Sequence, residues 1–389
     1  MKNNKKEKLV PELRFPEFEG EWENNKLGNI AEFDKGKNIS KADISEDGEI
    51  ECIRYGELYT RYKEIIEEVY SRTNLDKEEL VFSEKGDVLT PSSGETAIDI
   101  ATASCINKDD VALGGDINII RSDINGNFLA YYLSNKKRTD VARLAQGISV
   151  IHLYKSHLKS LSVNLPSKQE QQKISSFLSL IDKKIELLKK KKELLELYKK
   201  GVMQKIFNQE IRFKDKDGND YSEWEEKKLG EVCSNKKSGL LAREIKEEHD
   251  KYPVYGADGI TGYSDKYQER QDFVSIVKDG AGVGRVKFCR GKASVVGTLD
   301  IIMPKGDNDI FFLYLLLSML RLRRYVVGST IPHLYFKDYR NIKVEVPSFS
   351  IQVEISQTIS LLEKKNSNID RIISSTQVFK SGLLQKLFI

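Results

Sequence analysis

The stretch GISVIHLY at residues 147–154 returns as GSTIPHLY at residues 328–335, and this repeat decides how the chain is built. The offset of 181 residues then holds without a gap to the end of each copy. It places Gln171 on Gln352, and QKIF at 204–207 on QKLF at 385–388. A gapless match of this length is not chance, so the chain contains two copies of one unit.

The beginnings of the two copies also correspond, but with a different offset. LRF at 13–15, Trp22 and Lys26–Gly28 match IRF at 211–213, Trp224 and Lys228–Gly230. The copies therefore cover about 13–207 and 211–388 and differ in the length and sequence of their centres. Shared frames around divergent centres predict one scaffold that presents two different recognition surfaces. The alternative is a duplicated domain whose loops have drifted apart.

The repeated end of each copy predicts a strand followed by a long helix. Leu161, Val163 and Leu165 alternate with polar residues, as do Ile342, Val344 and Val346, and a period of two is typical of a strand with one buried face. After a proline, Ser167 and Ser348 stand where a helix N-cap belongs, and Glu170 predicts a capping box with Ser167.

Beyond these caps, apolar residues recur every three or four positions, which is the heptad pattern of a coiled coil. The first stripe is Ile174, Leu178, Ile181, Ile185, Leu188, Lys192, Leu195, Lys199, Val202 and Ile206, and the second is Ile355, Ile359, Leu362, Asn366, Ile369, Ile373, Thr376, Lys380, Leu383 and Leu387. Two stripes of equal length should pack against each other as helices of roughly 60 Å. Asn366 either sets the register or lies at a wet edge. The Lys189–Lys192 run is either a solvated face or a contact to phosphate or a partner.

Composition permits a nucleic-acid partner without demanding one. The 389 residues include 63 basic and 59 acidic residues, for a net charge of +4. The most apolar stretch, Ile310–Leu320, is too short for a bilayer that needs about twenty residues, so a buried helix is expected. The basic N-terminus lacks the apolar run of a signal peptide. Four scattered cysteines predict neither a zinc site nor a disulfide framework, and a cytoplasmic protein is expected.

Catalytic signatures are missing from the sequence. KDGAGVGRVKF at 278–288 carries three glycines after an apolar strand at 273–277, but its G-x-G-x-G spacing departs from the dinucleotide fingerprint. Because Val286 and Phe288 read as another strand, a hairpin turn with glycines at positive φ is favoured over a nucleotide loop. His152 and His333 lie in the shared frame, which favours structural roles. We therefore expect no catalytic residue, metal or cofactor in this chain.

The order of these motifs resembles the specificity subunits of type I restriction–modification systems. The resemblance covers nearly the whole chain. It rests on the W-x-x-x-K-L-G openings, KYPVYGADGITGYSDKY at 251–267, the G-x-[ST]-[IV]-x-H-L-Y closures, the P-S-x-x-x-Q-x-x-I segments and the long helices. It implies a protein that reads a bipartite, asymmetric site in double-stranded DNA. It also implies two methyltransferase subunits and two motor–nuclease subunits as partners, which would bind S-adenosylmethionine, ATP and Mg.

The fold expected from the repeat and the resemblance is α+β, with two target-recognition domains and an antiparallel coiled coil. The expected boundaries are 1–165 and 209–346 for the recognition domains, and 166–208 and 347–389 for the long helices. Two readers on a rigid coil should bind half-sites a fixed distance apart, about one duplex turn. The alternative function is a coiled-coil scaffold that organises protein partners without reading DNA.

Residues of polar or glycine-bearing loops in the divergent centres are the candidates for DNA contacts, because side chains in such loops can reach base edges or phosphates. In the first copy they are Lys35, Lys37, Arg54, Tyr55, Ser92, Ser93 and Thr96. In the second they are Lys236, Lys237, Arg243, Tyr255, Lys278 and Arg285.

Overall fold

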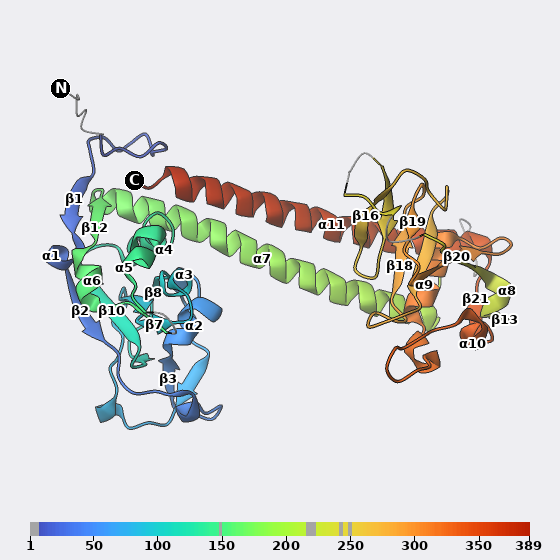
Figure 1. Ribbon diagram of the computed structural model, residues 1–389, viewed down its shortest axis with the longest axis horizontal. Helices are drawn as coiled ribbons and strands as arrows, with labels where there is room; N and C mark the ends of the chain where they lie inside the picture. Colours follow the sequence, from blue (N-terminus) through green and yellow to red (C-terminus); the bar gives the residue numbers. More distant parts are fainter. Residues whose placement is uncertain (1–7, 148–149, 215–222, 241–243, 248–250) are drawn as a thin grey trace. The chain divides into compact units, whose positions relative to one another are not determined.

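The computed structural model describes residues 8–147, 150–214, 223–240, 244–247 and 251–389 (Figure 1). The chain divides into two compact units. Unit 1 comprises Met1–Lys191 with Ile369–Ile389, and unit 2 comprises Lys192–Asn368. Each unit therefore takes its strands and short helices from one copy of the repeat and takes part of both long helices.

Unit 1 is built around a five-stranded mixed sheet in the order β2-β10-β6-β8-β4. These strands are Ala31–Lys35, Ile117–Ser122, Val88–Pro91, Ser104–Ile106 and Ile65–Ile66. A smaller sheet has the order β5-β3-β9, formed by Ser71–Thr73, Ile50–Ile53 and Ala112–Leu113. Two pairs complete the strands: β1 (Glu23–Lys26) with β12 (Ser162–Leu165), and β7 (Ser93–Gly94) with β11 (Ile151–His152).

Short helices connect these strands. They are α1 (Leu27–Ile30), α2 (Tyr55–Thr60), α3 (Ala97–Ile100), α4 (Gly126–Ser134), α5 (Arg138–Leu144) and α6 (Lys155–Ser160). One core cluster joins both sheets through Ile53, Leu89 and Ile119, which are fully buried. The alternating pattern predicted for residues 161–165 is confirmed as β12, whose Val163 is buried.

Unit 2 repeats this plan with different dimensions. Its main sheet has the order β14-β20-β17-β18, formed by Cys233–Lys237, Leu299–Pro304, Phe273–Val277 and Val286–Cys289. A second sheet, β16-β15-β19, contains Ile260–Ser264, Tyr252–Tyr255 and Ser294–Val295. The pair β13–β21 joins Glu225–Lys228 to Lys343–Val346. Its helices are α8 (Leu229–Val232), α9 (Ile310–Met319) and α10 (Phe336–Tyr339), and α9 is the buried apolar helix that the sequence predicts.

The two long helices are α7 (Lys168–Phe207) and α11 (Phe349–Lys386), and they pack together as predicted. In unit 1 the Nζ of Lys380 lies 2.8 Å from Asp182 Oδ1, and in unit 2 the Nζ of Lys199 lies 3.1 Å from Glu363 Oε1. Lys199 and Lys380 are repeat-related, as are Asp182 and Glu363. Both pairings run antiparallel, and they explain why a lysine interrupts each apolar stripe.

The C-terminal end of each long helix packs into the core of the unit that contains the other copy of the repeat, close to where that copy begins. In unit 1, Phe388 packs against Phe128, with ring centroids 5.4 Å apart, and the N–H of Leu13 donates to the carbonyl of Lys386 at 2.9 Å. In unit 2, Phe207 packs against Phe312 at 5.7 Å, and Ile211 donates to Lys205 at 3.1 Å. The arrangement of the two copies is therefore cyclic. Residues 8–15 lie beside the end of α11 in the way that residues 208–213 lie beside the end of α7.

The capping box predicted at Ser167 forms only in part. Ser167 Oγ accepts a hydrogen bond from the N–H of Glu170 at 3.3 Å. The carboxylate of Glu170 does not bond back to the cap, because it is buried against Arg14, which donates to its two oxygens at 2.8 and 2.7 Å. The charge-assisted hydrogen bonds between Arg14 and Glu170 are stronger than the bond that would close the capping box, so the carboxylate of Glu170 takes the former.

Candidate nucleic-acid interface

The same backbone scaffold carries the divergent loops of both units. In unit 1 the strand β6 runs into Ser92, whose carbonyl accepts from Leu153 at 3.0 Å and whose N–H donates to Asp116 at 2.8 Å. In unit 2 the strand β17 runs into Lys278, whose carbonyl accepts from Leu334 at 2.8 Å and whose N–H donates to Thr298 at 2.9 Å. Ser92 and Lys278 thus occupy equivalent positions, and so do Asp116 and Thr298.

Asp116 is the charge around which the predicted residues of unit 1 gather. Ser92 Oγ and Ser93 Oγ lie 3.3 and 3.1 Å from its two carboxylate oxygens, and Lys35 Nζ lies 3.4 Å away. Both serines are buried, so their hydroxyls hold Asp116 rather than reach the surface. Sequence reasoning missed Asp116, although its place between Gly114–Gly115 and the strand β10 was a usable signal.

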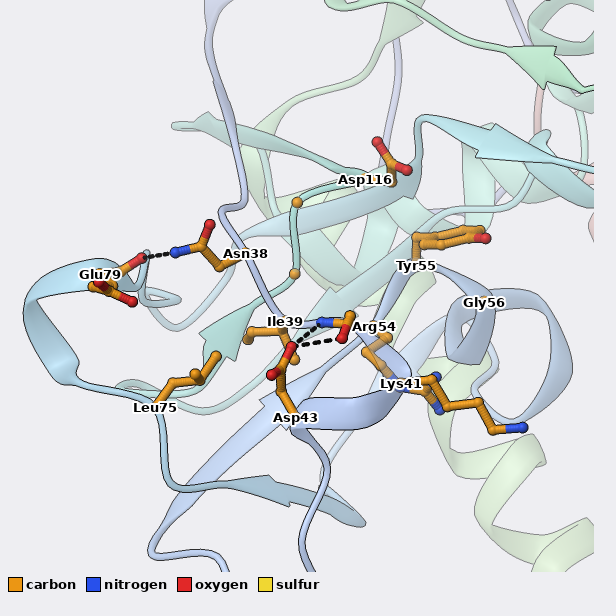
Figure 2. A pocket seen from close by; sticks show the side chains of 13 residues that line it. Asn38, Ile39, Lys41, Asp43, Arg54, Tyr55, Gly56, Leu75, Glu79 and Asp116 are labelled. Atoms are coloured by element: carbon orange, nitrogen blue, oxygen red, sulfur yellow. Dashed lines mark hydrogen bonds between the residues drawn. The ribbon is translucent and has the colours of Figure 1, made fainter.

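Asp116 forms one wall of a cleft of about 1110 Å³ in unit 1 (Figure 2). Its lining comes from the segments 38–43, 54–56, 75–79 and 114–116. Asn38 and Ile39 have φ values of 52° and 58°, a left-handed backbone that is uncommon for residues other than glycine. The loop keeps this shape because Asn38 O accepts from Gly115 N at 2.8 Å and Lys37 N donates to Leu113 O at 2.9 Å.

Arg54 and Tyr55 bring a cation and an aromatic ring to this cleft at the start of α2. The Nε of Arg54 is buried and has no hydrogen-bond partner among the described residues, and its nearest carboxylate oxygen, on Glu57, lies 3.8 Å away. Tyr55 is 37% exposed. Donors beside the carboxylate of Asp116 make a surface of mixed polarity, which suits base edges better than a row of phosphates.

The other predicted residues of unit 1 lie nearby with different roles. Lys37 is exposed on the loop that borders the cleft. Thr96 caps the helix α3, because its Oγ1 accepts from Asp99 N at 3.1 Å and lies 2.6 Å from Asp99 Oδ2. The structure therefore brings Lys35, Ser92 and Ser93 together around Asp116 and holds Thr96 in a helix cap.

In unit 2 three of the predicted basic residues are paired with carboxylates. Lys278 Nζ lies 2.8 Å from Asp279 Oδ2, and His333 Nδ1 lies 2.7 Å from the other oxygen of that carboxylate. Burial by itself raises the pKa of Asp279. The hydrogen bonds to Lys278 and His333 lower this pKa by more than burial raises it, so the net shift is downward. Arg285 pairs with Asp258 and Lys236 with Glu269.

The remaining predicted residues of unit 2 divide between surface and core. Lys237 lies opposite Asp300 in the β14–β20 pair, as Lys35 lies opposite Asn118 in unit 1, so these two lysines are equivalent. Tyr255 is partly buried against the core of unit 2, with its ring edge-on to Phe273 at 6.4 Å, and burial raises its pKa. Arg243 lies outside the described residues.

Asp300 is a buried carboxylate without full compensation. It is 3% exposed, its Oδ2 accepts from Asn235 Nδ2 at 3.2 Å, and its Oδ1 has no partner among the described residues. Burial raises its pKa. The equivalent Asn118 of unit 1 donates from Nδ2 to Leu153 O at 2.9 Å. The neutral amide of Asn118 is thus hydrogen-bonded at the position where unit 2 has the carboxylate of Asp300.

Among the described residues there is no group of three His, Cys, Asp or Glu side chains placed to hold a metal ion. All four cysteines are buried free thiols, and burial raises the pKa of Cys52 to about 11. In the part of the chain that the structure describes, no helix combines the length and apolar character needed to cross a membrane.

Comparison with known proteins gives consistent matches along the chain. The family model described as "Type I restriction modification DNA specificity domain" matches residues 19–197 and again 221–375. The MjaVIII specificity subunit of a type I restriction enzyme from Methanocaldococcus jannaschii is 26% identical over 420 residues, covering 96% of this chain and 93% of that protein. The MjaIX specificity subunit of the same organism is 26% identical over 302 residues, covering 69% and 70%.

A solved structure shares the whole fold. The crystal structure of a type I restriction–modification S subunit from M. genitalium superposes with a TM-score of 0.67 at 22% identity. The match covers 98% of this chain and 99% of that one.

Proposed function

Because the chain belongs to the family of type I restriction–modification DNA specificity domains, we propose that its two units read the two halves of one bipartite, asymmetric DNA site. The chain is the DNA specificity subunit of a type I restriction–modification system, a subunit type that is not catalytic. We further infer that it directs methyltransferase and motor–nuclease partners to that site.

One observation carries the proposal: equivalent scaffold positions hold different hydrogen-bonding groups in the two units. Unit 1 has Ser92 and Asp116 where unit 2 has Lys278 and Thr298. The backbone hydrogen bonds around these positions are the same, so the frame has been kept while the groups it presents have changed. A duplicated reader of two different half-sites needs this combination of a constant frame and variable donors and acceptors.

The residues that serve DNA recognition fall into two groups in this proposal. Arg54, Tyr55 and Asp116 face the cleft of unit 1 and read base edges, with Ser92 and Ser93 holding the carboxylate in place. Exposed lysines contact phosphates, because a flexible ammonium neutralises charge without sequence information. These include the equivalent pair Lys35 and Lys237, and also Lys37 and Lys236. Lys278, which is 18% exposed and stands where unit 1 has Ser92, belongs with the base readers in this proposal. Arg285 and Arg243 complete the predicted set in unit 2, and Thr96 and Tyr255 act through the structure of their units.

The long helices offer a surface for two copies of one partner. Leu180 and its repeat equivalent Leu361 are 66% and 58% exposed, and Tyr198 and its equivalent Phe379 are 61% and 56% exposed. Large exposed apolar residues at repeat-related positions on both helices favour two identical protein partners over solvent. Two methyltransferase subunits fit this role, and two motor–nuclease subunits join them in the complete enzyme.

In this proposal, DNA recognition and catalysis belong to different subunits. The recognition domains span 1–165 and 209–346, and the spacer helices span 166–208 and 347–389. S-adenosylmethionine, ATP and Mg bind the partner subunits, while this chain recognises the target sequence in double-stranded DNA. Because the chain must meet the DNA that its partners modify, a cytoplasmic location follows.

The test is a genome-wide map of methylated adenines in cells that express this chain with its cognate methyltransferase. We expect a new two-part motif, methylated on both strands and absent when the chain is deleted. An assembled complex that yields no new motif would instead support a scaffold without DNA readout. Binding of the complex to mixed-sequence duplex at two salt concentrations gives an independent check, because phosphate contacts produce a steep salt dependence.

A further inference from the structure

The segments that end the divergent centres carry the same stacked histidine and tyrosine side chains in both units. In unit 1 the rings of His152 and Tyr154 stack at 5.9 Å with an interplanar angle of 17°, and in unit 2 those of His333 and Tyr335 stack at 6.0 Å and 13°. Tyr154 is 53% exposed and Tyr335 is 41% exposed. Exposure to solvent alone does not explain why both copies of the repeat have this His–Tyr pair.

The backbone fixes these side chains in place in both units. His152 and Gln146 exchange hydrogen bonds at 2.7 and 2.9 Å, and His333 and Val327 do so at 2.7 and 2.8 Å. The position after Gln146 needs glycine: Gly147 has φ of 137°, and a Cβ there would collide with a backbone carbonyl oxygen. Gly328, at φ of 91°, meets the same restriction. A buried leucine follows each histidine, so the tyrosine after it leaves the core at a fixed point.

The stacked pair lies beside the residues proposed to read bases. In unit 1 the strand β11 pairs His152 with Ser93, whose hydroxyl holds Asp116 at the wall of the cleft. In unit 2 His333 touches Asp279, the neighbour of Lys278. The pair is therefore constant where the adjoining readers differ. The chemical group that binds this His–Tyr pair must therefore be one that both half-sites have in common.

Charge around the pair favours a polyanion as that group. Tyr154 is followed by the exposed Lys155 in unit 1. In unit 2 the Nζ of Lys337 lies 5.4 Å from the centre of the Tyr335 ring, and the exposed Arg323 and Arg324 precede the turn. Tyrosine hydroxyls and lysine ammonium groups are ordinary donors to phosphate oxygens, and such contacts position a protein without specifying sequence.

We propose that Tyr154 and Tyr335 bind the sugar–phosphate backbone of duplex DNA, one at each half-site, and so set the position from which each unit reads its bases. This inference rests on the proposed function and deepens it. The hydroxyl of each tyrosine donates to a phosphate oxygen, the stacked histidine holds the ring at a fixed angle, and Lys155 and Lys337 neutralise adjacent phosphates. Both tyrosines are positioning residues and do not choose the base sequence.

The test compares Tyr154→Phe, Tyr335→Phe and the double variant in the complete complex with the methyltransferase. Each variant keeps its ring and loses only the hydroxyl. We expect affinity to fall about five- to tenfold per tyrosine, by the same factor on cognate and mixed-sequence duplex, with an unchanged methylation motif. The salt dependence should stay the same for these variants, because a neutral donor releases no counterion. Lys155→Gln and Lys337→Gln should each reduce the slope of log affinity against log salt by about 1.

Tyr70→Phe is the matched control, because Tyr70 in unit 1 is 52% exposed and also has a cation over its ring, Arg61 at 4.2 Å. It should leave DNA affinity unchanged. Unaltered affinity in the double Tyr→Phe variant would overturn the inference, as would a change of motif. Impaired assembly with the methyltransferase at intact DNA affinity would assign the tyrosines to a protein contact instead. If the parent complex bound no duplex and made no motif, the proposed function itself would fail.

Discussion

Replacing Asp300 by asparagine should stabilise unit 2 at neutral pH. Asp300 is 3% exposed, and one of its carboxylate oxygens has no partner among the described residues. Leaving a buried polar group unsatisfied costs about 1–3 kcal/mol. An amide at this position repeats the arrangement of Asn118 in unit 1, whose Nδ2 donates to a backbone carbonyl. We therefore expect Asp300→Asn to gain about 1–3 kcal/mol, which corresponds to roughly 2–10 °C in the melting temperature of a unit of this size.

The gain should depend on pH in a defined direction. Burial raises the pKa of Asp300 in the folded state above its unfolded value, so the folded protein holds this proton more tightly. Stability from this group is complete below the unfolded pKa and is lost as pH rises through the raised folded pKa. Asp300→Asn removes that loss, so parent and variant should converge at acid pH and separate towards neutrality.

Thermal unfolding followed by circular dichroism between pH 4 and pH 8 measures this difference. Asn118→Asp in unit 1 is the mirror-image control, since it places an acid in the site that now holds an amide. It should destabilise unit 1 by a similar amount and introduce the same pH dependence there. An Asp300→Asn protein no more stable than its parent at pH 7, or a difference that persists unchanged at pH 4, would refute the reasoning.

Three further outcomes are expected. Lys380→Glu should destabilise unit 1 by about 1–3 kcal/mol in chemical denaturation, and Asp182→Lys in the same chain should restore part of that loss, because the two side chains form a partly buried ion pair at 2.8 Å. A circular permutant opened within 208–210, with Ile389 joined by a short linker to the original N-terminus, should fold and keep the same methylation motif. If it unfolds, the cyclic arrangement is wrong. Asp116→Asn should change the preferred base in one half of the motif only, with about 1–3 kcal/mol of discrimination lost in binding competition, and a change in both halves would contradict separate reading by the two units.

Several predictions from the sequence are confirmed because they depend on local periodicity. The alternation around Val163 and Val344 identifies two strands, and the apolar stripes identify α7 and α11. The strand and turn of residues 273–288 are also recognisable, since Gly280 and Gly284 do have positive φ. In each case residues close in the chain determine the backbone hydrogen bonds, so a pattern of a few residues is sufficient.

The roles of single polar residues are harder to predict. The sequence places Ser92 and Ser93 in a polar loop and predicts DNA contacts, but folding brings Asp116 to their hydroxyls from a turn more than twenty positions later in the chain. The spacing of Glu170 predicts a closed capping box, and Glu170 pairs with Arg14 instead. The heptad pattern allows either a seam position or a wet edge for Asn366, and at 8% exposure this residue is buried. These outcomes depend on partners that no local pattern identifies.

The sequence by itself determined the duplication, the two long helices and the divergence of the two centres, because repeats and heptads are properties of the chain. Only the tertiary structure decided which positions in the two centres are equivalent, since their lengths differ and no alignment of letters joins Ser92 to Lys278. Their equivalence is defined by backbone hydrogen bonds to Leu153 and Leu334, contacts between segments about 60 residues apart. Such contacts form because burial of each sheet brings distant strands together, and burial is a property of the folded chain.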